Sequence, residues 1–471
     1  MNACTFFSAF FRKIVLPENR KKVLFSAMIL LLAAGTLVRM GVMGRMEGHF
    51  LHNDGGDYLD ISRQIAEGNG FSSSMIHWYE PTPEGYKGEP RTAYHRPPLL
   101  PLLGAVLYFL PFPLLLSAKI AVLLMSAGCI LMVFLLAKEV TGSGKCAFLA
   151  AVFYTFYPYS IYHGICYSSE NLFLFLTCGA FYFLSRCIRK DFSPRYAALC
   201  GGMTALATLT RPQGFGFFLL LGFLGTVLML FRGKWRKKLF LSLICYTAGA
   251  FLLLAPWMVR NFLAAGRPTP LTFYGAYSFA LASSDISFDT FRYLDTPLYK
   301  EKTDRTWNEF HEEKRNFLAK KGIYNLPAAE PYWKQWAWEY IRKHPDRMLY
   351  IVWNRLLHCF RIVPNTAFTS GTVLFLLRIY CIPLFLLALA GIFFQRKNVH
   401  AMLLLTAPLC VLLFALPFLM LLRFRYPYFA PEVSIFAACG AVALADRLRS
   451  RLKGQKEKGL PPERASGESP S

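Results

Sequence analysis

The chain has 471 residues, of which 55% are hydrophobic, 16% aromatic and only 17% charged. This composition excludes a string of soluble domains and predicts an integral membrane protein with many spans. The formal net charge is +24, but the chain is too apolar for an ordinary nucleic-acid binder, so nucleic acid is not an expected partner. A polytopic protein gathers Lys and Arg in its cytoplasmic segments, and most of the positive charge therefore indicates orientation in the membrane.

Apolar runs long enough to cross a bilayer recur along the chain, at about 20 residues for a hydrocarbon core of about 30 Å. The predicted fold class is therefore all-α: an integral membrane bundle of about ten transmembrane helices, with juxtamembrane helices in the first outer loop. The expected spans are residues 24–43, 119–137, 146–165, 171–187, 196–211, 215–231, 239–259, 372–394, 400–422 and 427–446.

The stretch 99–116 is apolar but is interrupted by prolines, so a span, a re-entrant piece and an interfacial helix are all open. Charge favours a segment that does not cross. In that case every short basic segment falls on one side of the membrane, whereas a crossing would turn the loops between Lys138 and Lys397 outward, against the positive-inside rule. We therefore expect 99–116 beside the membrane and both termini in the cytoplasm, in a multi-pass protein of the inner or plasma membrane.

Two long segments are then expected on the outer side of the membrane, 44–98 and 261–371. In the second, aromatic and charged residues alternate at helical spacing over 331–343, which predicts an amphipathic helix at the membrane interface. A similar pattern runs over 347–361. The predicted organisation is a basic cytoplasmic N-terminus, 1–22; a transmembrane module with the first outer loop, 23–260; an outer loop with interfacial helices, 261–371; C-terminal transmembrane helices, 372–446; and a disordered cytoplasmic tail, 447–471.

Signals for familiar soluble chemistry are missing from the sequence. The twelve cysteines are scattered, mostly in apolar runs and without C-x-x-C, which predicts helix packing rather than disulfides or a zinc site. No H-E-x-x-H, P-loop, G-x-S-x-G or dinucleotide fingerprint occurs, which argues against hydrolase, ATPase and oxidoreductase functions. His49 and His52 form only a short H-x-x-H, a weak metal signal.

Charged residues at the outer ends of spans are the informative ones, because an ion there costs about 3 kcal/mol unless it is paired or wet. Carboxylates and arginines gathered at the mouth of an apolar bundle suit an anionic lipid head group. The candidates on this face are Asp54, Asp57, His95, Arg96, Glu170, Arg211, Arg260, Arg423 and Arg425.

Each candidate also has a simpler explanation. A lone arginine such as Arg211 or Arg260 can extend to lipid head groups without binding a substrate. Asp54 and Asp57 can cap the helix that follows them. Their coincidence on one membrane face, rather than any single residue, favours a site.

A series of short motifs follows in a fixed order along the chain. They are Asp54-x-x-Asp57-Tyr58, residues 65–71, 96–102, 169–173, 209–214 and 256–261, and Arg425-Tyr426-Pro427. This series resembles the GT-C superfamily of glycosyltransferases, and most closely its bacterial branch related to protein O-mannosyltransferases and to the lipid A aminoarabinose and galacturonic acid transferases. The likeness fades after about residue 280, apart from the last motif.

The resemblance implies a membrane glycosyltransferase with 23–260 as a GT-C-type catalytic module. Such enzymes move a sugar from a polyprenyl-phosphate donor to an acceptor on the outer face, by an inverting single displacement. In the family an acidic residue of the first outer loop acts on the acceptor, and Asp54 takes that position here. The family often has Asp-Glu where this chain has Asp54-Gly55, which leaves open whether Asp57 shares the role. Glu170 takes the position of a second acidic residue, which in some relatives helps to bind a metal; the cofactor is otherwise unknown, with a divalent metal ion as the candidate.

The residue types agree with this chemistry. A carboxylate shielded from water can take the acceptor proton, and arginines can stabilise the charge that grows on the leaving phosphate. The expected donor-phosphate residues are Arg96, Arg211, Arg260 and Arg425. The sequence leaves the sugar open (hexosyl or pentosyl), and the acceptor too: a glycan, a lipid or a protein. Two other functions stay open, an O-antigen-type polymerase or ligase and a lipid or glycolipid transporter without transferase activity.

Overall fold

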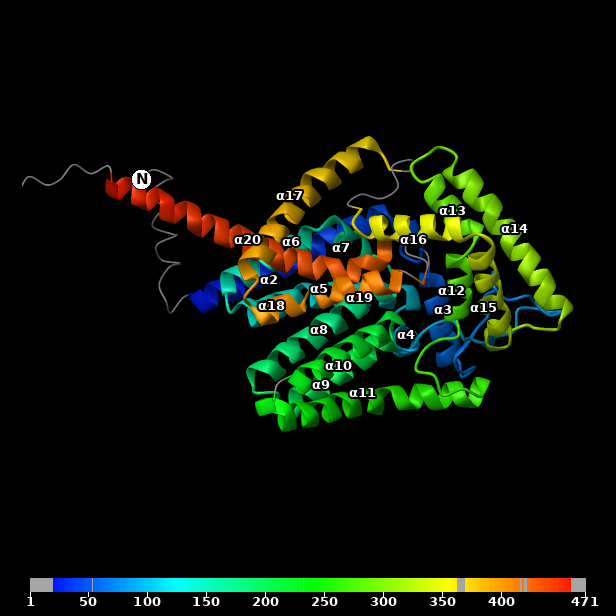
Figure 1. The fold of residues 1–471 in the computed structure, drawn as a ribbon. Helices are drawn as coiled ribbons and strands as arrows, with labels where there is room; N and C mark the ends of the chain where they lie inside the picture. Colours follow the sequence, from blue (N-terminus) through cyan, green and yellow to red (C-terminus); the bar gives the residue numbers. More distant parts are fainter. Residues whose placement is uncertain are drawn as a thin grey trace, which may run out of the picture.

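The structure, a computed structural model, describes residues 20–52, 54–231, 233–361, 369–415, 417–418 and 422–458. Within these residues the chain is almost entirely helical (Figure 1). Seven helices of the described residues are long and apolar enough to cross a membrane, and each contains one of the expected spans, so the chain is an all-α, multi-pass membrane protein. They are α2 (Arg20–Arg45), α5 (Leu114–Thr141), α8 (Ser169–Arg189), α10 (Gln213–Phe231), α11 (Arg236–Ala265), α17 (Gly371–Gln395) and α20 (Leu422–Lys458).

Of the other three expected spans, 146–165 and 196–211 fall in shorter helices and 400–422 lies partly outside the described residues, so the count of ten is not confirmed. Prolines set two of these limits, because the residue before a proline is pushed out of the helical conformation. Pro158 divides the expected span 146–165, and Pro212 follows the end of 196–211. The helices are α6 (Gly144–Phe156) and α7 (Pro158–His163), α9 (Pro194–Thr208), and α18 (Val399–Leu403) with α19 (Thr406–Ala415); a one-turn helix η2 (Gly233–Trp235) joins α10 to α11.

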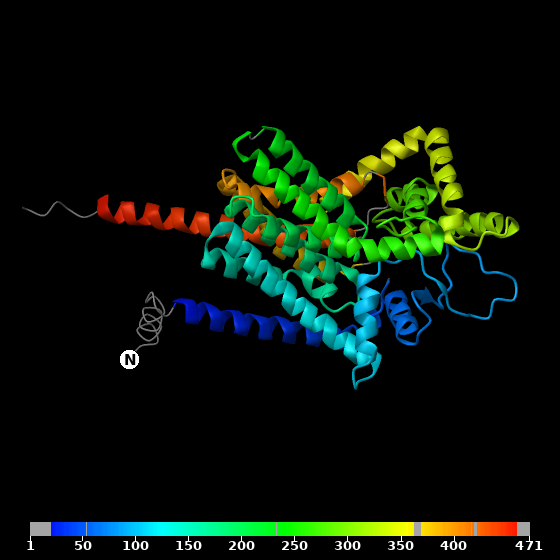
Figure 2. The ribbon, with the colours of Figure 1, turned by 90° about the horizontal axis from the view of Figure 1, so that it is seen from below.

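The long helices run side by side, and small residues let them approach closely. A Cβ atom added at Gly440 of α20 would meet the carbonyl of Leu387 in α17, so these two helices touch through their backbones. All eleven cysteines of the described residues are free and ten are buried, as expected for helix packing. The start of α2 and the end of α20 lie at one end of the bundle, and the outer segments gather at the opposite end (Figures 1 and 2).

The first outer segment combines short helices with two short strands. Helix α4 has ten residues, or about 15 Å, which is too short to cross a bilayer, and it lies across the direction of the long helices (Figure 2). It packs closely on α3 because Gly104 has no side chain; a Cβ there would meet the hydroxyls of Ser62 and Tyr167. The elements are η1 (Glu47–His49), α3 (Gly55–Ala66), the antiparallel strands β1 (Ser72–Ser73) and β2 (Arg91–Thr92), and α4 (Leu99–Tyr108).

The second outer segment has its own hydrophobic core. Trp333 and Leu318 are fully buried in it, together with Tyr277 and with Tyr79 from the first outer segment. The helix expected over 331–343 begins earlier, where the Asn325 side chain accepts a hydrogen bond from the Ala328 backbone, and its aromatic face packs into this core. The elements are α12 (Gly275–Ala282), α13 (Asp285–Arg292), α14 (Tyr299–Lys320), α15 (Leu326–Lys343) and α16 (Pro345–Cys359).

Two further expectations concern the helix predicted over 347–361 and the tail predicted from residue 447. Helix α16 leaves Leu349, Trp353 and Leu357 exposed as one apolar stripe, the pattern of a helix at a membrane surface. Helix α20 continues to Lys458, so the tail expected from residue 447 is helical over its first part, where Arg, Leu, Lys and Gln favour a helix. Residues 1–19 and 459–471 of the two expected terminal segments lie outside the described residues.

Candidate active site

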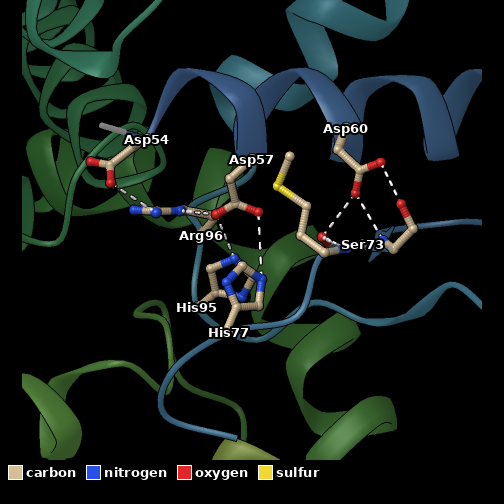
Figure 3. Close-up of polar contacts among 9 residues, drawn as sticks. Asp54, Asp57, Asp60, Ser73, His77, His95 and Arg96 are labelled. Carbon is tan, nitrogen blue, oxygen red and sulfur yellow. Dashed lines mark hydrogen bonds and ion pairs between the residues drawn. The ribbon is translucent and has the colours of Figure 1, made fainter. Parts of the chain in front are cut away.

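The first acid–arginine group lies where α3 begins (Figure 3). Asp54 occupies the N-cap position of α3, but its side chain makes no capping hydrogen bond. Its carboxylate instead accepts a hydrogen bond from Nη2 of Arg96, with Oδ1 at 2.9 Å. Nε of the same arginine donates to Oδ2 of Asp57 at 2.5 Å. Arg96 therefore joins the two acids, and the capping explanation does not account for the Asp54 side chain.

The two acids differ in access to solvent. The Asp54 side chain is 23% exposed and that of Asp57 only 7%. Two histidines also face Asp57: Nε2 of His95 lies 2.7 Å from Oδ2, and Nε2 of His77 lies 3.6 Å from Oδ1 (Figure 3). Burial alone would raise the pKa of Asp57, but His95 and Arg96 outweigh it and hold the pKa well below its usual range, so the carboxylate is ionised.

His77 was missed in the sequence because it belongs to no motif and no periodic pattern. The structure positions it through Asp60, which lies on the same face of α3 as Asp57. Oδ2 of Asp60 accepts from the Ser73 hydroxyl at 2.9 Å and from the Ser74 backbone at 2.8 Å, and so ties the loop before His77 to α3. Burial and the nearby His95 lower the pKa of His77 to about 3, so its imidazole is neutral. The pair Asp60 and Ser73-Ser74 is the signal that points to this loop.

The second acid–arginine group joins the starts of α8 and α10. Glu170 lies in the first turn of α8, where the helix dipole favours a negative charge. Its Oε1 is 2.9 Å from Nη1 of Arg211, and the side chains are 3% and 8% exposed. Arg211 also donates to the Ser169 hydroxyl at 2.9 Å. Arg211 is therefore buried against an acid, which differs from an arginine extended to lipid head groups.

Tyr58 connects the two groups. The guanidinium of Arg96 lies over its ring, 5.1 Å from the centroid, and its hydroxyl lies near the Ser169 side chain and within the electrostatic reach of Arg211. The backbone makes a second connection, because the first residue of α4, Leu99, donates to the Leu209 carbonyl at the end of α9 at 2.8 Å. Residues far apart in the sequence thus form one continuous polar site at the end of the bundle opposite the start of α2 (Figure 1).

Arg260 of α11 contacts the backbone of the first outer segment rather than the acids of the site. It donates to the carbonyl of Ala93 at 2.8 Å and to that of Phe71 at 3.3 Å, the residues that flank the two strands. Its guanidinium also lies over the rings of Phe71, Tyr94 and Trp257, at 5.1, 5.5 and 4.8 Å. No carboxylate of the described residues pairs with it. The structure therefore gives Arg260 contacts that fix the first outer segment just before His95.

The side chains of Arg423 and Arg425 lie outside the described part of the chain. Their neighbour Tyr426 is described and buried. Its hydroxyl is 2.8 Å from that of Tyr154 and donates to Oδ1 of Asn171 at 3.0 Å. This motif therefore reaches the start of α8, next to Glu170.

A metal held by Glu170, which the family resemblance implies for some relatives, does not fit this arrangement, and neither does one shared with Asp54. Each of the two carboxylates has an arginine nitrogen at 2.9 Å, and neither belongs to a group of three or more metal-ligating side chains among the described residues. The pair His49 and His52 belongs to no such group there either. The group that does occur in the described residues is Asp57, His77 and His95, with ligand atoms within 4.8 Å of one another.

Residues 95–259 match the family described as dolichyl-phosphate-mannose-protein mannosyltransferase. The matched segment includes Arg96, Glu170 and Arg211 and leaves out Asp54 and Asp57. No curated protein sequence matches the chain.

The fold is similar to that of an oligosaccharyltransferase from Archaeoglobus fulgidus. Its apo form is 16% identical with a TM-score of 0.50, over 93% of this chain and 52% of that chain. The same protein tethered to an acceptor peptide containing the NVT sequon is 15% identical with a TM-score of 0.50, over 90% and 50%. This chain thus spans about half the length of that protein. ArnT from Cupriavidus metallidurans bound to undecaprenyl phosphate aligns over 95% of this chain and 82% of its own, at 14% identity, but its TM-score of 0.39 is too low to support an argument.

Proposed function

We propose that the chain is a membrane glycosyltransferase of the GT-C type with a polyprenyl-phosphate-linked sugar as donor, a proposal supported by the family match of residues 95–259 and by the similarity in fold to the oligosaccharyltransferase. One observation carries the proposal: the group Asp54, Arg96 and Asp57 lies beside the pair Glu170 and Arg211, and Tyr58 connects them. The site thus combines an accessible carboxylate with two guanidinium groups at the edge of an apolar bundle. These are the groups needed for proton removal and for binding a lipid phosphate.

Asp54 is the base in this proposal. It is the more exposed of the two first-loop acids, so an acceptor can reach it. As the acceptor oxygen attacks the anomeric carbon, Asp54 takes its proton, while the phosphate leaves from the opposite face of the sugar and the configuration inverts. Asp57 is buried and holds Nε of Arg96, so its part in the reaction is to position that arginine.

Arg96 and Arg211 receive the donor phosphate. As the bond to the sugar breaks, negative charge grows on the phosphate oxygens, and guanidinium groups stabilise it with charge-assisted hydrogen bonds. Each arginine already faces an acid, which keeps it oriented before the donor arrives. Arg260 acts indirectly by fixing the segment before Arg96. Arg425 remains a donor-binding candidate on the motif alone.

The orientation of the protein follows from charge. The basic loops between α5 and α6, α8 and α9, and α10 and α11 lie at the end of the bundle where α2 begins and α20 ends (Figure 1). The positive-inside rule makes this end cytoplasmic. The proposed site then lies on the outer face of the cell membrane, with both termini in the cytoplasm. The prenyl chain of the donor lies among the apolar helices.

The test is sugar transfer by the purified protein in vesicles supplied with polyprenyl-phosphate-linked sugars. Mass spectrometry of glycans, glycolipids and proteins from cells with and without the gene identifies the acceptor. A new glycosidic bond that depends on the protein supports the proposal. Movement of labelled lipid across the bilayer without any such bond would contradict it and favour a transporter.

A further inference from the structure

Asp57, His77 and His95 form a compact set of three side chains next to the two acid–arginine groups (Figure 3). We propose that these three residues bind one divalent transition-metal ion of the zinc type. The ion does not occupy the position of Glu170, which the family resemblance connects with a metal, since Glu170 pairs with Arg211. The inference adds a metal to the site of the proposed function, but metal binding is measured without sugar transfer.

The distances suit a shared ion. The three ligand atoms lie within 4.8 Å of one another, and Oδ1 of Asp57 is 3.6 Å from Nε2 of His77. Two ligands of a four-coordinate zinc ion with bonds of about 2.0–2.1 Å are about 3.3 Å apart. The separation is too long for a hydrogen bond and close to that of two atoms on one metal.

Two of the ligand atoms lack another partner. Oδ1 of Asp57 and Nε2 of His77 are buried and make no hydrogen bond within the described residues. Buried polar atoms without partners are costly and uncommon in native proteins. A metal ion between the two atoms satisfies both of them, and it does so with a carboxylate that is 7% exposed.

The surroundings resemble those of a metal ligand set. When Oδ1 of Asp57 binds the ion, Oδ2, which lies 2.7 Å from Nε2 of His95, still accepts from Nε of Arg96, the kind of outer contact that orients a ligating carboxylate. On the other side, the Tyr79 ring stacks on His77 with centroids 5.1 Å apart and packs on Tyr277 at 4.8 Å. The second outer segment thus closes the site against water.

The ligand types select the metal. Two imidazole nitrogens and one carboxylate oxygen suit zinc and related first-row ions, whereas magnesium and calcium prefer oxygen ligands throughout. Three protein ligands leave a coordination position for water or for a substrate oxygen. Through Asp57 the ion fixes Arg96, so its first effect is on the position of the arginine that faces the donor.

The test is zinc content of the purified full-length protein, measured by mass spectrometry after dialysis against zinc and then buffer. The wild type should retain about one zinc per chain, and His77→Ala and His95→Ala should each bind zinc at least about tenfold more weakly. The double variant His49→Ala with His52→Ala is the matched control, since it also removes outer histidines, and it should retain the metal. Zinc retained by His77→Ala as well as by the wild type would overturn the inference.

Cobalt supplies a second readout that survives if the alanine variants fold poorly. His77→Cys keeps a ligand at the same place, so the variant should still bind cobalt and should gain a strong near-ultraviolet absorption from thiolate-to-cobalt charge transfer. An unchanged cobalt spectrum would contradict the assignment of His77. A wild-type protein that transfers sugar but binds neither zinc nor cobalt would overturn this inference alone, whereas one that binds zinc through His77 and His95 but transfers no sugar would overturn the proposed function alone.

Discussion

The two acid–arginine groups of the site both hold an arginine beside a carboxylate, but they differ in how far they are buried. Glu170 and Arg211 are almost completely buried and face each other, while Asp54, Arg96 and Asp57 form a row that becomes more exposed toward Asp54. A buried ion pair tolerates the loss of one member poorly, whereas an exposed acid can exchange a proton with a substrate. Glu170 is therefore suited to holding Arg211 in position for the donor phosphate, and the exposed Asp54 to proton transfer.

The variant Asp54→Asn tests whether the exposed acid is the base, and it should have the largest effect on activity. Sugar transfer should fall at least about 100-fold, because the base is lost, while the free energy of unfolding stays nearly unchanged. The asparagine oxygen can still accept from Arg96, and Arg96 keeps its contact with Asp57. The measurements are turnover in vesicles and thermal unfolding in detergent.

Glu67→Gln is the matched control for this variant, because it removes one negative charge at the other end of α3, from an exposed pair with Arg63. It should leave turnover unchanged. Wild-type turnover in Asp54→Asn would remove Asp54 from the reaction.

The buried pair should respond mainly in stability. Glu170→Gln leaves Arg211 buried beside a neutral side chain, and the cost of breaking such a pair is about 3–5 kcal/mol. Chemical unfolding of the variant in detergent measures this loss. Combining it with Arg211→Met should recover part of the stability, since the unpaired charge is removed. If Glu170→Gln lost less free energy of unfolding than Asp54→Asn, the structural role would belong to Asp54 rather than to Glu170.

His311 differs from the arginines of the two groups, because it is a buried ionisable side chain whose hydrogen-bond partners are not acids. Nε2 lies 2.7 Å from the Tyr277 hydroxyl, and Nδ1 donates to the Trp307 carbonyl at 2.7 Å. Burial lowers its pKa from 6.5 to about 4. Between these two pH values the unfolded chain binds more protons, so the stability of the second outer segment is full above about pH 6.5 and falls as the pH decreases, by at most about 3 kcal/mol.

Tryptophan fluorescence during thermal unfolding follows this loss, because Trp307 and Trp333 lie in the same segment. His311→Gln should make the midpoint less dependent on pH over this range. An equal pH dependence in both proteins would assign it to other groups.

Tyr58→Phe should have the smallest effect. The variant loses one hydroxyl contact with Ser169, worth about 1 kcal/mol, and keeps the ring under Arg96. A double-mutant cycle with Asp54→Asn and Arg211→Gln, measured in both backgrounds, reports the coupling of the two groups. Coupling that does not weaken in Tyr58→Phe would mean that the backbone, rather than Tyr58, connects them.

The sequence predicts the parts of this molecule that depend on local composition. Seven spans follow from apolar length alone, and Asp54 and Arg96 follow from short motifs. The expected spans 146–165 and 196–211 run past the ends of their helices, because hydropathy averages over turns such as the one before Pro158. Composition shows that a segment is apolar but not where its backbone leaves the helix.

The contacts of the site depend on closure of the first outer segment, which a linear pattern does not contain. In the sequence Arg260 is one more arginine at the end of a span, yet in the structure it donates hydrogen bonds to the carbonyls of Phe71 and Ala93. Trp333 illustrates the same limit, because an aromatic face at helical spacing looks alike on a membrane surface and in a protein core. His77 enters the site only because Asp60 ties down the preceding serines.

Helices α3, α4 and α8 all begin at this site, and their close packing at Gly104 and Tyr167 keeps the beginnings together. The amino end of an α-helix carries about half a positive elementary charge from its aligned peptide dipoles. Three such ends near one site add a positive potential that does not titrate and that no side-chain substitution removes. Because the carboxylates of Asp54, Asp57 and Glu170 lie at the same place, this backbone potential offsets only part of their negative charge, and we therefore expect anion binding to be lost when Arg96 and Arg211 are both neutralised.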